Sequence, residues 1–132
     1  MKAVVLDVSL TMEWFSASAS RVALEKRALL DDRVAVVPQL WRYEVMNVIA
    51  TWRRRGDISG AQGTRILNNV FKLPFAVVDE GSPEAVLELA NTHALTAYDA
   101  TYLRVAIVTG EPLASLDKTL VKAASREGIE CL

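Results

Sequence analysis

The feature that most constrains the fold is a series of short, strongly apolar runs that alternate with longer segments of helical character. The runs cover residues 3–6, 34–37, 75–78 and 113–116, with a fifth candidate at 129–132. Runs this short and this apolar are typical of strands that are covered on both faces. The alternation predicts a three-layer α/β/α sandwich with a short, mostly parallel central sheet and right-handed crossovers between adjacent strands.

Helices are expected between the runs. Residues 19–30 are rich in good helix formers, and residues 40–55 carry apolar side chains at helical spacing before Gly56. Ser59 followed by Gln62 predicts a capping box, and Ser82 before Pro83 predicts an N-cap with a first-turn proline. The later helices are therefore expected over residues 59–71, 82–92, 99–109 and 118–126.

Length and composition indicate one compact domain spanning residues 1–132. Hydrophobic residues make up 52% of the chain and charged residues 23%, which is ordinary globular usage. Cys131 is the single cysteine and His93 the single histidine, so neither an internal disulfide nor a zinc cluster is expected. The start of the chain lacks the shape of a signal peptide, and no stretch approaches the ~20 apolar residues of a membrane span. A cytoplasmic protein without membrane contact is the expectation.

Four acidic residues stand where an apolar run ends or a helix begins: Asp7, Glu44, Asp99 and Asp117. Each also fits a purely structural role, because an acid at a helix start caps free N–H groups and complements the helix dipole. Open α/β sheets bind ligands beside the carboxyl ends of their strands, so the four should share one rim. Like charges gathered in one cleft need a cation, and Mg²⁺ and Mn²⁺ prefer carboxylate oxygen. The pattern predicts a magnesium site holding one ion with its water shell, or two ions.

Four segments around these acids resemble the PIN-domain ribonucleases, specifically the VapC toxins of type II toxin-antitoxin pairs. They are VVLDVSLTMEWF, VVPQLWRYEVMNVI, LTAYDATYLRVAI and PLASLDKTLVKAASREGI, in this order along the chain. Each segment alone is a weak signal, but the four in the right order are specific. The resemblance runs from the first residue to the last and implies a PIN-like fold.

The resemblance places the family's four acids on Asp7, Glu44, Asp99 and Asp117, as catalytic residues and metal ligands. It places a hydroxyl residue that orients carboxylates or waters on Ser9 and another on Ser115. Val8 stands where members often carry a smaller or polar residue. The implied activity is Mg²⁺-dependent endoribonuclease cleavage, with Mn²⁺ as a substitute, by in-line attack that expels the 3′ oxygen and leaves a 5′ phosphate.

The resemblance also implies partners: an RNA substrate, a VapB-like antitoxin whose tail crosses the active-site groove, and a second copy of the chain in a homodimer. A net charge of −1 argues against a broad basic surface, but it does not argue against a nuclease that binds RNA through a few local contacts. The run Arg53-Arg54-Arg55 closes a helix, which favours a solvated last turn over a phosphate clamp. Arg42 could reach the rim of the site, but its spacing from Glu44 leaves its direction open.

Five aromatic residues lie in the first two helical regions, and most are expected in the core: Trp14, Phe15, Trp41, Tyr43 and Trp52. Any that were exposed would form a patch for a partner chain. His93 is expected at the surface or at a helix end.

Two other functions remain open on the sequence. One is a catalytically silent PIN-fold module that only binds partners. The other is a magnesium-dependent phosphotransfer domain of the receiver or phosphatase type, which also places an aspartate after its first strand. Ser9 stands where such phosphatases carry a second aspartate, and a receiver needs an acidic pair after strand one, whereas this chain has only Asp7.

Overall fold

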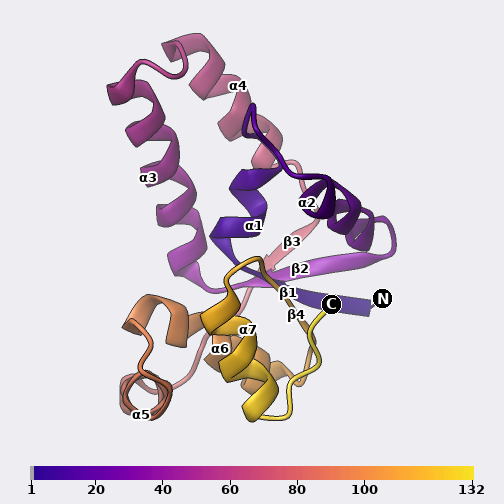
Figure 1. The fold of residues 1–132 in the computed structure, drawn as a ribbon, viewed down its shortest axis with the longest axis vertical. Coiled ribbons are helices and arrows are strands. Elements are labelled where there is room, and N and C mark those ends of the chain that lie inside the picture. Colours follow the sequence, from indigo (N-terminus) through magenta and orange to yellow (C-terminus); the bar gives the residue numbers. More distant parts are fainter. Residues whose placement is uncertain (1) are drawn as a thin grey trace.

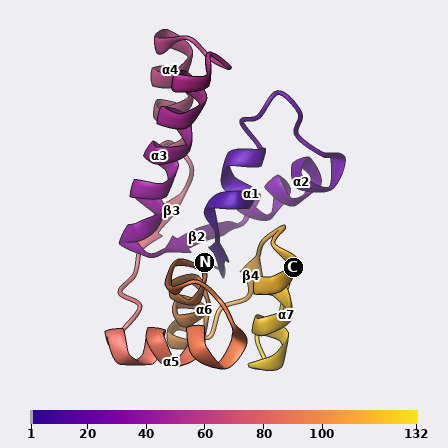
Figure 2. The same cartoon turned by 60° about the vertical axis from the view of Figure 1, so that its left-hand side comes forward.

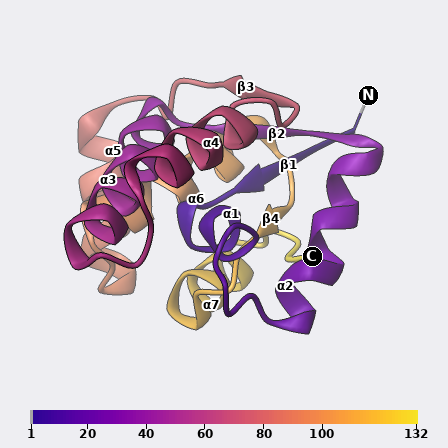
Figure 3. The same ribbon diagram turned by 90° about the horizontal axis from the view of Figure 1, so that it is seen from above.

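The structure is a computed structural model that describes residues 2–132. A central sheet of four strands has the order β3-β2-β1-β4, and every strand pairing is parallel. The strands are β1 (Lys2–Leu6), β2 (Arg33–Val37), β3 (Phe75–Val77) and β4 (Leu113–Ala114). Seen from above in Figure 3, the four strands follow one another across the molecule in this order.

Within residues 2–132, seven α-helices and a 3-10 helix connect and cover the strands. They are α1 (Val8–Glu13), α2 (Arg21–Lys26), the 3-10 helix η1 (Arg27–Asp31), α3 (Gln39–Arg55), α4 (Gly60–Val70), α5 (Pro83–His93), α6 (Ala97–Thr109) and α7 (Lys118–Arg126). Helices α1 to α4 lie on one side of the sheet and α5 to α7 on the other (Figures 1 and 2). This arrangement confirms the predicted three-layer α/β/α sandwich.

The layer assignment follows from the strand order. From β1 the chain moves outward through β2 to β3, and it then returns across the sheet to place β4 on the other side of β1. Right-handed crossovers that run in opposite directions put their helices on opposite faces of the sheet. The direction changes between β1 and β4, so these two strands flank the crevice where open α/β sheets bind ligands.

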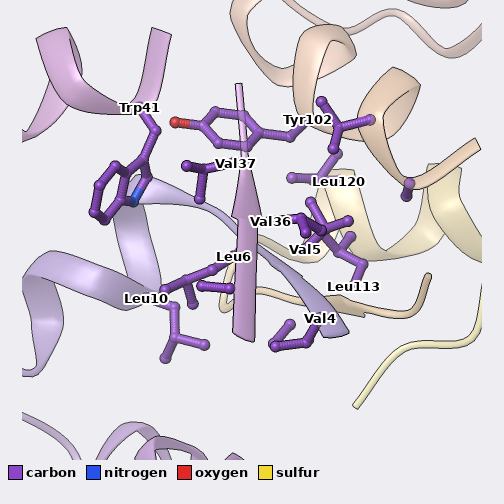
Figure 4. Packing of buried hydrophobic residues seen from close by; sticks show 14 of the residues in the cluster. Val4, Val5, Leu6, Leu10, Val36, Val37, Trp41, Tyr102, Leu113 and Leu120 are labelled. Carbon is purple, nitrogen blue, oxygen red and sulfur yellow. The ribbon is translucent and has the colours of Figure 1, made fainter. Parts of the chain in front are cut away.

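The core lies on both faces of β1 and β2. Val4, Val5 and Leu6 are at most 1% exposed, and Val36 and Val37 are also buried. Figure 4 shows these strand residues between Leu10 and Trp41 on one face and Leu113 and Leu120 toward the other. Full burial on both faces explains why these strands have no polar alternation.

Three details differ from the sequence prediction. The expected helix over residues 19–30 is divided into α2 and the 3-10 helix η1. The fifth strand is wrong, because the end of the chain forms only an isolated parallel bridge between Leu113 and Cys131. The third strand is a short edge strand in which Ala76 and Val77 are exposed, so it is not covered on both faces.

Helix ends agree closely with the predicted capping. Ser59 and Gln62 form the reciprocal capping box at the start of α4, and Ser82 caps α5 ahead of Pro83. Gly110 adopts a left-handed conformation at the end of α6, which a residue without a Cβ enters at little cost. Among residues 2–132, none of the helices has the length and apolar character needed to cross a bilayer.

Candidate active site at the carboxyl ends of β1 and β4

Asp7 is the first residue after β1 and lies at the centre of the site. It is only 4% exposed, and it is the N-cap of α1. Its Oδ1 accepts a hydrogen bond from the backbone N–H of Leu10 at 3.0 Å. Its Oδ2 accepts two more, from the Ser9 hydroxyl at 2.8 Å and from the Ser115 hydroxyl at 2.6 Å. Asp7 is therefore held in one orientation by three donors.

Ser115 joins the ends of β1 and β4. Its hydroxyl donates to Asp7 and accepts a hydrogen bond from the backbone N–H of Asp117 at 2.9 Å. Asp117 in turn caps α7, because its Oδ1 accepts from the N–H of Leu120 at 3.1 Å. A single hydroxyl thus fixes the two acids that follow the two strands, 110 positions apart in the chain.

Glu44 approaches the same region from α3, and its carboxylate meets a residue of α6. The Tyr102 hydroxyl donates a hydrogen bond to Glu44 Oε1 at 2.5 Å. Tyr102 is 1% exposed, and Figure 4 shows its hydroxyl pointing toward the side of the core where Trp41 lies. Glu44 sits in the second turn of α3, so its placement depends on this tyrosine and not on a cap.

Asp99 lies in the first turn of α6. Thr96 is the N-cap of this helix, and its hydroxyl accepts a hydrogen bond from the N–H of Asp99 at 3.1 Å. The side chain of Asp99 is only partly buried, and the Thr96 hydroxyl also lowers the pKa of its carboxyl group against the effect of burial. The residue that caps α6 therefore also acts on the Asp99 side chain.

The acids influence one another electrostatically. Burial raises the pKa of Asp7, and the charge of Asp117 adds to the rise, while the hydrogen bonds from Ser115, Leu10 and Ser9 oppose it. Burial also raises the pKa of Glu44. The charges of Asp99 and Asp7 raise it further, whereas the hydrogen bond from the Tyr102 hydroxyl lowers it. The pKa of Asp99 is raised by burial and by Asp117. Each of the four predicted acids therefore lies close enough to another of them to interact with it electrostatically.

A divalent cation suits this set of donors. Burial and the neighbouring negative charges raise the pKa values of Asp7, Glu44 and Asp99, and a bound cation would offset both effects. The donors are carboxylates and hydroxyls, and carboxylate oxygen is a ligand that Mg²⁺ and Mn²⁺ prefer. Within residues 2–132, no group of three or more His, Cys, Asp or Glu side chains is arranged to hold an ion by itself. The residues therefore fit an ion held by one or two carboxylates that keeps most of its water shell.

Two features of the site were missed by sequence analysis. Tyr102 was not singled out, although it follows Asp99 by three positions and therefore lies on the same helix face. Burial and the neighbouring Glu44 raise the pKa of Tyr102, so its hydroxyl stays protonated as a donor. Thr11 was missed as well: its hydroxyl donates to the backbone oxygen of Asp7 at 2.7 Å and accepts from Trp41 Nε1 at 3.0 Å.

Two of the arginines singled out in the sequence, Arg53 and Arg42, contact other parts of the protein. Arg53 donates to the backbone oxygen of Gly60 and to Thr64 Oγ1 at 3.0 Å, so it ties α3 to α4. The guanidinium of Arg42 lies 5.6 Å from the ring centre of Phe71. The Arg42 side chain therefore points toward Phe71, with which it makes a cation–π contact.

The aromatic residues divide as expected between core and surface. Trp14 and Trp41 are buried, whereas Tyr43 is 59% exposed on α3. His93 is the last residue of α5, as expected for a helix end, but its side chain is only 7% exposed.

The fold and this group of carboxylates define a class: parallel α/β proteins with an acidic site at the point where the strand order reverses. Both the sequence and the fold of this chain are similar to those of known proteins of this class. Residues 4–125 match the family model described as the PIN domain. The chain belongs to the PIN domain family, whose members are generally nucleases that use divalent metal ions.

Solved structures share the fold over nearly the whole chain. The structure of PAE2754 from Pyrobaculum aerophilum is 23% identical, with a TM-score of 0.73, and the match covers 98% of this chain and 90% of that one. FitAcB from Neisseria gonorrhoeae is 15% identical with a TM-score of 0.68, covering 98% and 96% of the two chains. FitAB bound to an IR36 DNA fragment gives the same identity and TM-score, covering 98% and 93%. No curated protein matches the chain.

Proposed function

We propose that this protein is a metal-dependent endoribonuclease and the toxin component of a type II toxin-antitoxin pair. The observation that carries the proposal is the buried Asp7 carboxylate, fixed by Ser9, Ser115 and the Leu10 N–H at the switch point of the sheet. Three further acids adjoin it, and charges within this group help to raise the pKa values of Asp7, Glu44 and Asp99. Such a set of charges is stabilised by a cation, and phosphodiester hydrolysis is chemistry that a cation-binding carboxylate site supports.

The protein's own residues would prepare the site for this reaction. Asp7, Asp99, Glu44 and Asp117 would hold Mg²⁺, or Mn²⁺ in its place, directly or through water. When bound, the ion supplies positive charge to the scissile phosphate and makes a coordinated water more acidic. Ser9 and Ser115 keep Asp7 in one rotamer, so the carboxylate needs little reorganisation when charge develops on the substrate. Tyr102 does the same for Glu44.

RNA as substrate, an antitoxin as partner and a homodimer are supported by the resemblance of four segments to VapC toxins. One of the solved structures of the same fold is FitAB bound to a DNA fragment. This chain carries exposed Tyr43 and Met46 on α3 and exposed Tyr98 on α6, the two helices that supply Glu44 and Asp99. An antitoxin that packs against these two helices would cover such exposed side chains. Such a pair would act in the cytoplasm.

Cleavage of a panel of single-stranded and structured RNAs, with Mg²⁺, Mn²⁺ or EDTA, tests the proposal. The wild type is expected to cut in the presence of either metal and to lose the activity in EDTA. Asp99→Asn is expected to fold normally and to lose at least a hundredfold in rate, because the ion loses an anionic ligand. Asp57→Asn, which changes an exposed acid at the far end of α3, is the matched control.

Two results would contradict the nuclease. Cleavage by Asp99→Asn at the wild-type rate would show that the site is elsewhere or that the activity is a contaminant. A folded, antitoxin-free wild type that cuts no RNA with any metal would favour a PIN-fold module that only binds partners.

A further inference from the structure

A basic groove lies between the end of α5 and the exposed face of α7, outside the carboxylate site. It is a pocket of about 300 Å³ lined by His93, Lys118, Thr119, Lys122, Ala123 and Arg126. Among residues 2–132, none of the lining side chains is acidic, and the nearest acid given for them is Glu127, whose Oε1 lies 3.3 Å from His93 Nε2. In a protein whose net charge is −1, three cations and a histidine around one pocket form a local positive region.

The cations of this groove follow one face of α7. Lys118, Lys122 and Arg126 are spaced by four residues, so their side chains lie one above the other along the helix. All three are exposed. Within residues 2–132, none of the three side chains makes an ion pair or a hydrogen bond, in contrast to Arg53 and Lys26, which are engaged by other parts of the protein. The row is therefore free to hold an anionic ligand.

His93 supplies a second, independent sign of a ligand. Its side chain is 7% exposed and lines the groove, yet its Nε2 is buried without a hydrogen-bond partner in residues 2–132. Glu127 Oε1 lies 3.3 Å away, but the contact does not have the geometry of a hydrogen bond. Apart from this ion-pair contact with Glu127, the nitrogen is one of the few buried polar atoms that a native structure leaves without a hydrogen bond, and a ligand in the groove can supply one.

The groove begins beside the candidate active site. Lys118 directly follows Asp117, which is joined to Asp7 through Ser115. From Lys118 the row extends along α7 for about 12 Å, at ~1.5 Å per residue. Successive cations of the row lie about 6 Å apart along the helix, so they can contact different phosphates of one strand. Both the charge and the direction of the groove suit a strand that leaves the carboxylate site.

We propose that this groove binds the sugar-phosphate backbone of the RNA strand on one side of the scissile bond. Lys118, Lys122 and Arg126 contact successive phosphates, and His93 donates from Nε2 to a phosphate oxygen. The inference rests on the proposed function, because it takes its ligand from the reaction at the adjacent carboxylates. Contacts of this type position the strand without reading its bases.

Binding measured without cleavage tests the groove. A fluorescein-labelled 12-nucleotide single-stranded RNA is titrated with the full-length protein in EDTA at several salt concentrations. The double variant Lys118→Gln/Lys122→Gln is expected to bind about tenfold or more weakly at low salt, with a salt slope smaller by ~1.4, because each lost phosphate contact removes ~0.7. Arg65→Gln/Lys72→Gln, which removes two exposed cations on and just after α4, is the matched control and should change affinity less than twofold.

His93→Phe separates the histidine from the charge row, since it keeps a ring of similar size and removes Nε2. Its affinity is expected to fall several-fold with little change in the salt slope, provided that its melting temperature stays near the wild-type value. Wild-type affinity in a folded His93→Phe variant would remove His93 from the proposal.

The outcomes distinguish this inference from the proposed function. Suppose that Lys118→Gln/Lys122→Gln and its control bind RNA equally, in a protein whose RNA cleavage depends on Asp99. This result overturns the proposal that the groove binds RNA and leaves the proposed nuclease activity intact. RNA binding that depends on these lysines, without any metal-dependent cleavage, supports RNA binding by the groove and overturns the proposed nuclease activity. Tighter lysine-dependent binding of poly-glutamate than of RNA of equal charge assigns the groove to an acidic protein segment and overturns the nucleic-acid assignment.

Discussion

Asp7 is the residue on which the site depends most, because it is buried and yet accepts three hydrogen bonds. Burial favours its neutral form, while the donors favour the carboxylate. The Ser115 bond is the shortest of the three, at 2.6 Å, and among the hydrogen bonds it opposes the rise in the pKa of Asp7 most. Among the three donors, Ser115 therefore contributes most to keeping Asp7 ionised.

Ser115→Ala is expected to lower kcat/KM by about tenfold or more, since a hydrogen bond to a charged group contributes about 1.5–3 kcal/mol. The loss should be larger at lower pH, because the pKa of Asp7 rises further without this donor. Ser9→Ala is the matched control: it removes an exposed donor at 2.8 Å and should have a smaller effect. Steady-state cleavage kinetics across pH would measure both variants. Equal effects would contradict the dominant role of Ser115.

Tyr102 has the corresponding role for Glu44, and its removal should be visible as a pH effect. The hydrogen bond from Tyr102 lowers the pKa of Glu44 against the effect of burial. Tyr102→Phe is therefore expected to raise the pKa of Glu44 and to shift the acidic limb of the kcat/KM profile to higher pH. Stability should change little, because the ring that fills the core is kept. An unshifted limb with wild-type rates would exclude a part for Tyr102 in placing Glu44.

At the scale of elements, the predictions that succeeded depended on local signals. Short apolar runs identified the four strands, and Ser59 with Gln62 identified the start of α4. The predictions that failed depended on packing. Residues 129–132 are apolar enough for a strand, but only Cys131 pairs with β4. Tyr102 was missed because its partner, Glu44, is 58 residues away and spacing does not reveal such contacts.

The placement of Asp99 depends on the start of α6, which makes the Thr96 cap a test at this scale. Thr96→Ala is expected to lower the free energy of unfolding by about 1 kcal/mol and also to lower the cleavage rate, because the turn that carries Asp99 loosens. Ser59→Ala, which removes the cap of α4, should cost a similar amount of stability and leave the rate unchanged. Chemical denaturation would measure the free energy of unfolding of both variants, and cleavage kinetics would measure their rates. Equal rates would show that the cap serves stability alone.

For the whole molecule, the acidic site is a source of instability that a metal relieves. The folded-state pKa values of Asp7, Glu44 and Asp99 are all raised. Between the ordinary carboxyl pKa near 4 and the raised values, the folded protein binds more protons than the unfolded chain. The free energy of unfolding therefore falls as pH rises through that window, and the penalty is fully present above it.

In EDTA, the melting temperature is accordingly expected to decrease as pH is raised from the ordinary carboxyl pKa near 4 through the raised pKa values, and Glu44→Gln or Asp99→Asn should flatten the decrease. Saturating Mn²⁺ at pH 7 should restore stability, by about 2.7 kcal/mol at a hundred times Kd, and either substitution should shrink that gain. Asp57→Asn should leave both the slope and the gain unchanged. A wild-type melting temperature that rises with pH in EDTA, or a Mn²⁺ gain that survives both substitutions, would mean that these carboxylates are not the site that the metal stabilises.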